Sequence, residues 1–99
     1  MALKIATITV TTSGTRVPLA ATSTPVRWFA VQPTSTNTLN VYIGDSTVSH
    51  SGPTGISLAP SAAPFQFPPA GGAGAVWDLA LVFADADTSG NSFSLVYLL

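Results

Sequence analysis

The residues best suited to acid–base or nucleophilic chemistry are one histidine and a few aspartates. Hydrolysis by a serine nucleophile needs a base beside the serine and an acid that orients the base. Serines are plentiful, but His50 is the single histidine, and it lies in the turn-like segment Ser49-His50-Ser51-Gly52-Pro53. A histidine in such a segment is expected to be a solvated loop residue. The sequence therefore predicts no hydrolytic triad, and we expect the protein not to be an enzyme.

The acidic residues offer one further candidate, a metal loop. The segment Asp85-Ala-Asp87-Thr-Ser89-Gly90 begins like a calcium loop, but the twelfth position, which must supply a carboxylate, is Val96. Asp and Gly are also the residues that a hairpin turn requires. The glycine-rich segment 71–74 has no Lys-Ser or Lys-Thr after it, as a phosphate-binding loop would. We therefore expect a turn at 85–90, with no metal and no cofactor.

The small number of charges is the most informative property of the composition. Charged residues make up 7% of the 99 residues and the net charge is -1, whereas a soluble domain is typically about 25% charged. A nearly neutral surface favours association with other protein. The length allows one domain, residues 1–99, with a marginal core and no cysteine for disulfides. Oligomerisation is therefore the expected source of additional stability.

Other partners are not indicated. The three basic residues, Lys4, Arg16 and Arg27, are scattered and form no patch for nucleic acid. The longest apolar run, 79–84, is far shorter than the roughly 20 residues of a membrane span. Lys4 is followed by a threonine-interrupted stretch, not by the apolar core of a signal peptide. We expect a protein that is made in the cytoplasm and stays soluble until it meets a partner.

Short apolar stretches rich in β-branched residues are separated by turn signals every eight to twelve residues or so. This spacing is typical of an all-β sandwich or barrel, and no stretch has helical periodicity. The predicted fold is a single antiparallel two-sheet sandwich, jelly-roll-like, with about eight short strands. The expected strands are residues 4–10, 15–19, 26–31, 39–43, 56–58, 65–67, 76–84 and 92–99.

Three segments suggest contact with another chain. Residues 59–74 form a Pro/Gly-rich loop, and its prolines allow 65–67 to be an edge strand at most. This loop either covers the protein's own core or packs Phe65 or Phe67 against a neighbouring subunit. Strands 26–31 and 76–84 are apolar on both faces, so a loop or another copy must cover them. The interface candidates are Val26, Phe29, Val31, Phe65, Phe67, Val76 and Val82. Changing Phe29 or Phe67 to Asp is expected to abolish assembly.

Several segments, in their order and spacing, resemble the small all-β virion proteins of tailed bacteriophages, over roughly residues 5–99. The Pro-rich stretch 59–74 departs from the pattern of those proteins, in which we expect a more polar segment. The segments that carry the resemblance are 11–19 (TTSGTRVPL), 23–28 (STPVRW), 39–48 (LNVYIGDSTV), 55–60 (GISLAP), 85–90 (DADTSG) and 95–99 (LVYLL).

The resemblance implies a jelly-roll-like structural protein of the virion. Such proteins are commonly decoration or cement proteins, often homotrimers, that bind the lattice of the major capsid protein on the outer surface of the head. The expected alternative is a tail, head-fibre or tip component with a host-binding role. It would need exposed aromatic residues above a polar groove, whereas we expect core burial for the four candidates. A third possibility is an unrelated secreted sandwich. The aromatic candidates are Trp28, Tyr42, Trp77 and Tyr97.

Overall fold

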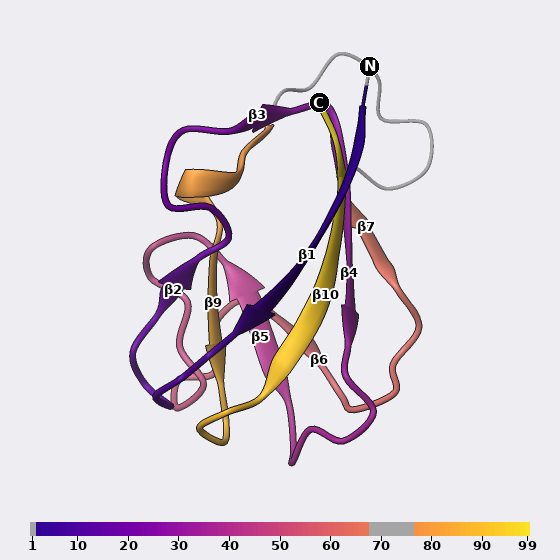
Figure 1. Ribbon diagram of the computed structural model, residues 1–99. Helices are drawn as coiled ribbons and strands as arrows, with labels where there is room; N and C mark the ends of the chain where they lie inside the picture. The colour runs from indigo at the N-terminus through magenta and orange to yellow at the C-terminus, as the bar shows by residue number, and fades with distance from the viewer. Residues whose placement is uncertain (1, 68–76) are drawn as a thin grey trace.

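Two four-stranded antiparallel sheets contain most of the strands in the described residues, 2–67 and 77–99, of the computed structural model (Figure 1). Sheet 1 has the order β1-β10-β4-β7, and sheet 2 has the order β2-β9-β5-β6. The strands of sheet 1 are β1 (Leu3–Thr9), β10 (Ser92–Leu98), β4 (Trp28–Pro33) and β7 (Phe65–Phe67); those of sheet 2 are β2 (Val17–Pro18), β9 (Phe83–Ala86), β5 (Val41–Gly44) and β6 (Ile56–Leu58).

A third, very short ladder joins β3 (Pro25–Val26) to β8 (Trp77–Asp78). Without these two short strands, the chain alternates between the sheets except at the β5–β6 hairpin. The first and last strands are neighbours in sheet 1, and the second strand pairs with the next-to-last in sheet 2. This is the order of a jelly roll, so the predicted antiparallel two-sheet sandwich is confirmed.

The core lies between the two sheets and is filled by alternate residues of each strand. Phe29 and Val31 of β4 and Phe93 and Leu95 of β10 are fully buried on the inner face of sheet 1. Val41, Ile43, Ala84 and Ala86 cover the facing side of sheet 2. Because side chains alternate along a strand, the residues between these positions point outwards from the sandwich or towards its ends.

The sequence predicted one continuous strand at 76–84, and this prediction is wrong. A single 3-10 turn, η1 (Leu79–Leu81), separates β8 from β9, and Leu79 is buried whereas Leu81 is 67% exposed. Asp78 stabilises the turn, because its carboxylate accepts hydrogen bonds from the backbone N–H groups of Ala80 (3.0 Å) and Thr24 (2.9 Å). This carboxylate completes the first turn of η1 and ties it to the chain before β3.

The remaining differences from the predicted strands are smaller. The strand expected at 26–31 is divided at Arg27 into β3 and β4, which pair with different partners. Leu39 has a positive φ of 61° and lies before β5, so it cannot continue the strand expected from 39. Strand β7 lies at the edge of sheet 1, as predicted for residues 65–67, and residues 68–74 of the proline-rich loop lie outside the described part of the chain.

Candidate functional site

The structure divides the predicted interface residues between the core and its margin. Val26, Phe29 and Val31 are at most 1% exposed, so packing within one chain accounts for their apolar character. Their side chains have no surface to offer to a partner. Phe65, Phe67 and Val82 are half-buried and pack against that core, and Val76 lies outside the described residues. The margin residues are therefore the part of the predicted set that a partner could reach.

The aromatic residues at this margin form one cluster. The rings of Phe29 and Phe67 stack with centroids 4.6 Å apart and an interplanar angle of 8°. Trp77 presents its edge to both rings at 6.0 Å. The cluster borders a mainly apolar hollow of about 430 Å³ that reaches Ile56 and Leu81. The buried indole N–H of Trp77 meets no acceptor among the described residues.

A second apolar surface lies on the outer face of sheet 1. The register places Leu3, Leu98 and Trp28 in one row across β1, β10 and β4. The next row is Ile5, Val96 and Ala30, and the row after it is Thr7, Ser94 and Gln32. Hydrophobic side chains thus occupy one half of this face and polar ones the other. We call this set the outer apolar patch: Leu3, Ile5, Trp28, Ala30, Val96 and Leu98.

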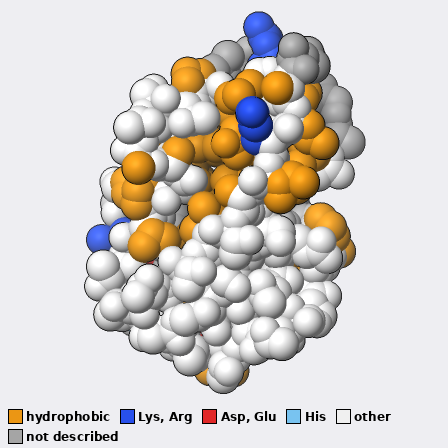
Figure 2. Space-filling model, viewed as in Figure 1, with side chains coloured by type: hydrophobic (Ala, Val, Ile, Leu, Met, Phe, Trp, Pro, Cys, Tyr) orange, Lys and Arg blue, Asp and Glu red, His pale blue; other side chains and the backbone are white. Residues whose placement is uncertain are grey.

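The side chains of the outer apolar patch are accessible to different degrees: Ala30 is buried, and Val96 and Leu98 are half-buried. Leu3 is 62% exposed and Ile5 is 76% exposed, which is unusual for two large aliphatic residues of one strand. Trp28 is half-buried, and its indole N–H donates to the side-chain oxygen of Gln66 at 3.2 Å. Figure 2 shows hydrophobic side chains gathered over the upper half of the molecule, the half in which both chain ends lie, above a mostly polar lower half.

Sequence reasoning missed this surface. The sequence predicts an ordinary strand at residues 4–10, and it indicates an interface only in the strands that are apolar on both faces. The signal was present in β1 itself, because Leu3 and Ile5 share one face while Ala6 and Ile8 share the other. Only the second pair packs against the core. Which face was exposed could not be decided without knowing which strand lies beside β1.

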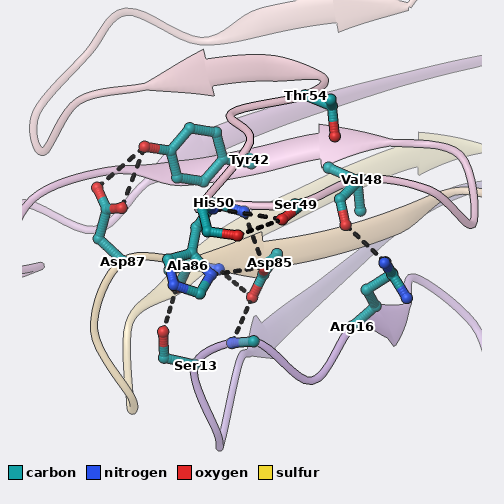
Figure 3. A network of polar contacts seen from close by, with 12 residues as sticks. Ser13, Arg16, Tyr42, Val48, Ser49, His50, Thr54, Asp85, Ala86 and Asp87 are labelled. Atoms are coloured by element: carbon teal, nitrogen blue, oxygen red, sulfur yellow. Dashed lines mark hydrogen bonds and ion pairs between the residues drawn. The ribbon is translucent and has the colours of Figure 1, made fainter.

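A buried carboxylate, that of Asp85 in β9, organises the polar residues of the loops beside sheet 2 (Figure 3). One oxygen of Asp85 accepts hydrogen bonds from the backbone N–H groups of Gly14 (2.9 Å) and Ala86 (2.8 Å). The other accepts from the backbone N–H of His50 and lies 2.9 Å from its Nδ1. Asp85 thus ties the loop after β1 and the loop after β5 to strand β9.

His50 is therefore not the solvated loop residue that the sequence predicted. Its side chain is 28% exposed and is held by Asp85, whose side chain is 2% exposed. An Asp–His pair supplies two members of a hydrolytic triad, but the nearby hydroxyls are engaged elsewhere. Ser13 donates to the carbonyl oxygen of Ala86 (2.7 Å), and the hydroxyls of Ser49 and Ser51 bond to each other (3.1 Å). The arrangement joins loops, and in the part of the chain that the structure describes no hydroxyl group forms a hydrogen bond with the His50 imidazole.

The environment of Asp85 makes stability depend on pH. Burial raises its pKa, but the hydrogen bonds from His50, Ala86 and Gly14 outweigh burial and lower the pKa from 3.8 to about 2. Because the folded-state pKa lies below the unfolded one, this stabilisation is present above about pH 4 and is lost as the pH falls towards 2. A shift of this size corresponds to about 2 kcal/mol.

We therefore expect the free energy of unfolding to fall by about 2 kcal/mol from this carboxyl group between pH 5 and pH 2. Urea titrations at a series of pH values would measure it. The variant Asp85→Asn cannot ionise at this position, so its stability should vary less over the same range. Equal pH dependence of the two proteins would contradict the assignment to Asp85.

The carboxylates of the predicted turn bind protein groups. Asp87 accepts hydrogen bonds from the backbone N–H of Asn40 (3.0 Å) and from the hydroxyl of Tyr42 (3.1 Å). Burial, followed by this contact with Asp87, raises the pKa of Tyr42. Among the described residues, no group of three or more His, Asp or Glu side chains is placed to hold a metal ion. Asp85 belongs to β9, and the turn itself begins after Ala86.

Comparison with protein-family models, curated proteins and solved structures finds no match for this chain. Within residues 2–67 and 77–99, no helix is long and apolar enough to span a membrane. The outer apolar patch is therefore the candidate functional site, and its geometry and chemistry are the basis for a proposal.

Proposed function

We propose that this protein is a non-enzymatic structural protein of a tailed-phage virion. In this role it is a decoration or cement protein, seated on the lattice of the major capsid protein on the outer surface of the head. The outer apolar patch is the observation that carries the proposal. Only 7% of the residues are charged, and the side chains of Leu3 and Ile5 are 62% and 76% exposed on the outer face of sheet 1. Contiguous exposed apolar surface of this kind marks interaction sites.

The chemistry of the patch suits a permanent contact. Binding of a protein to an assembled lattice stabilises that lattice by mass action, because the separated subunits lack the complete binding surface. Apolar and hydroxyl contacts are little affected by salt screening, unlike ion pairs. Several copies held together would add their weak contacts through a high effective concentration. The homotrimer that the resemblance implies would do this, and it stays a prediction.

One observation favours the alternative role, a tail, head-fibre or tip component that binds a host surface. Trp28 is only partly buried and lies beside the amide of Gln66, which accepts its indole hydrogen bond. A flat aromatic face beside a hydrogen-bonding side chain is what recognition of a sugar ring requires. Tyr42, in contrast, is buried, and Trp77 and Tyr97 pack against the core.

Localisation on the particle distinguishes the two roles. Gold-labelled antibody against this chain should decorate the heads of virions of the phage that encodes it, and virions from which the gene is deleted should be unlabelled. Label confined to the tail or its tip would support the alternative role. Virions that lack the chain altogether would overturn both proposals.

Binding to heads tests the outer apolar patch itself. Purified protein added to heads from the deletion strain should bind saturably, and about 1 M NaCl should weaken binding little, because few charges contribute to the contact. Val96→Asp should reduce affinity at least about tenfold, whereas Ser94→Asp should have little effect. Both substitutions add one charge to the outer face of β10. Equal binding of the two variants would place the contact elsewhere.

A further inference from the structure

Within residues 2–67 and 77–99, strand β1 has one edge that pairs with no other strand. It is the outermost strand of sheet 1 and pairs with β10 on one side only. The backbone hydrogen bonds from Val10 N–H to Asn91 C=O (2.9 Å) and from Leu99 N–H to Ala2 C=O (3.0 Å) fix the pattern of this ladder. In an antiparallel pair the hydrogen-bonded residues alternate. Even-numbered residues of β1 therefore bond to β10, and odd-numbered residues direct their N–H and C=O groups outwards.

The groups at this edge belong to Leu3, Ile5, Thr7 and Thr9. These four residues are exposed, and the first two carry the most accessible side chains of the outer apolar patch. No backbone hydrogen bond from another described segment reaches them. The edge is thus a row of free donors and acceptors bordered by apolar side chains, which is a template for another strand.

Strand β1 has few of the usual protections of an edge strand. The other edge strands of the two sheets are only two or three residues long, whereas β1 has seven residues. It contains no proline and no acidic residue, its register shows no bulge, and its one charge is Lys4. Short length, charge, proline and bulges are the features that keep strand edges from pairing. An edge of seven residues with one charge as its only protection is consistent with use as an interface.

We infer that a second copy of this chain pairs with the free edge of β1, antiparallel and centred on Ala6. In this register Leu3 faces Thr9 of the partner subunit, and Ile5 faces Thr7 of the partner subunit. All the outward N–H and C=O groups of β1 are then paired. Sheet 1 of one chain and sheet 1 of the other become one continuous eight-stranded sheet. The contact is two-fold symmetric, so each chain contributes the same strand.

A second copy fits this edge for two further reasons. Ile5 lies diagonally across the symmetry axis from its counterpart in the other chain, close enough for large side chains to touch. Lys4 lies opposite Ile8 of the partner subunit, so the single charge of β1 does not face itself. The low total charge of the chain adds little repulsion. The inference does not depend on the proposed virion role, and it predicts a dimer in solution in place of the homotrimer that the resemblance implies.

Mass in solution and amide exchange test the inference together. Light scattering should give about twice 10.1 kDa at high concentration, falling towards the single-chain mass on dilution. Hydrogen exchange should show the amides of Ile5 and Thr7 protected in the concentrated sample and exposed in the dilute one. The amides of Ala6 and Ile8 should be protected in both. A single-chain mass at all concentrations, or a trimer with Ile5 and Thr7 exposed, would overturn the inference.

Two variants and a control distinguish pairing through the edge of β1 from contact through the outer face of sheet 1. Thr7→Pro removes an outward N–H without removing a bond to β10, and Ile5→Lys places a charge at the edge. Each should give a folded protein with the single-chain mass. Gln32→Lys adds the same charge to the outer face of β4, away from the edge, and should keep the double mass. A double mass retained by both edge variants would contradict the pairing, and circular dichroism would verify that they fold.

Discussion

Replacing Phe29 by alanine is expected to lower the free energy of unfolding by about 3–5 kcal/mol. The side chain is 0% exposed, stacks on Phe67 at 4.6 Å and meets the edge of Trp77 at 6.0 Å. Its removal leaves a cavity between the sheets and ends both aromatic contacts. A domain is typically stable by about 5–15 kcal/mol, so this loss is a large fraction of the total.

Urea titration followed by tryptophan fluorescence would measure this loss, with Phe29→Leu as the control that keeps most of the volume. A loss below about 1 kcal/mol for alanine would contradict the packing described above. The same burial changes the interpretation of Phe29→Asp, which the sequence predicted to abolish assembly. A charge in this core should unfold the single chain, so that variant cannot report on an interface.

Replacing Asp85 by alanine is expected to cost about 3–5 kcal/mol, comparable to breaking a buried ion pair. The substitution leaves the backbone N–H groups of Gly14 and His50 without their acceptor, and these groups join two loops to β9. Each buried donor without a partner is itself destabilising. Urea titration at pH 7 would measure the loss, and the imidazole resonances of His50 would report its release.

Asp45→Ala is the matched control, because this exposed aspartate bonds only within its own turn, to Thr47. Its stability should be close to that of the unchanged protein. Equal losses for the two alanine variants would show that removing any carboxylate has the same effect, and the organising role of Asp85 would then be wrong.

The class of fold could be predicted because it depends on a pattern that repeats along the chain. Residues 92–99 alternate between inward and outward side chains, and the predicted strand there agrees with β10. The interruption at η1 could not be predicted in the same way. The run Leu79-Ala-Leu81 is compatible with a strand, and the turn is favoured in part by the contact of Asp78 with Thr24, which is 54 residues away.

The candidate site was harder to predict than the fold. An apolar residue in a strand indicates burial or contact, but which of the two depends on the neighbouring strands. Val31 and Ile5 are both β-branched residues in apolar strands, and one is 0% exposed while the other is 76% exposed. The difference arises because Val31 faces the opposite sheet and Ile5 does not. Strand order and register therefore decide the site, and both depend on long-range pairing.

The pairing of β1 with β10 also determines when the protein can finish folding. Leu3 pairs with Leu98, so the two strands join segments from opposite ends of the described chain. Contacts of such large sequence separation make folding slow, on the order of milliseconds to seconds for β-sandwiches. During synthesis, β1 leaves the ribosome long before β10, the strand that it pairs with among the described residues. Until residues 92–98 are made, β1 is without its partner strand, so the complete fold can form only after β10 has emerged.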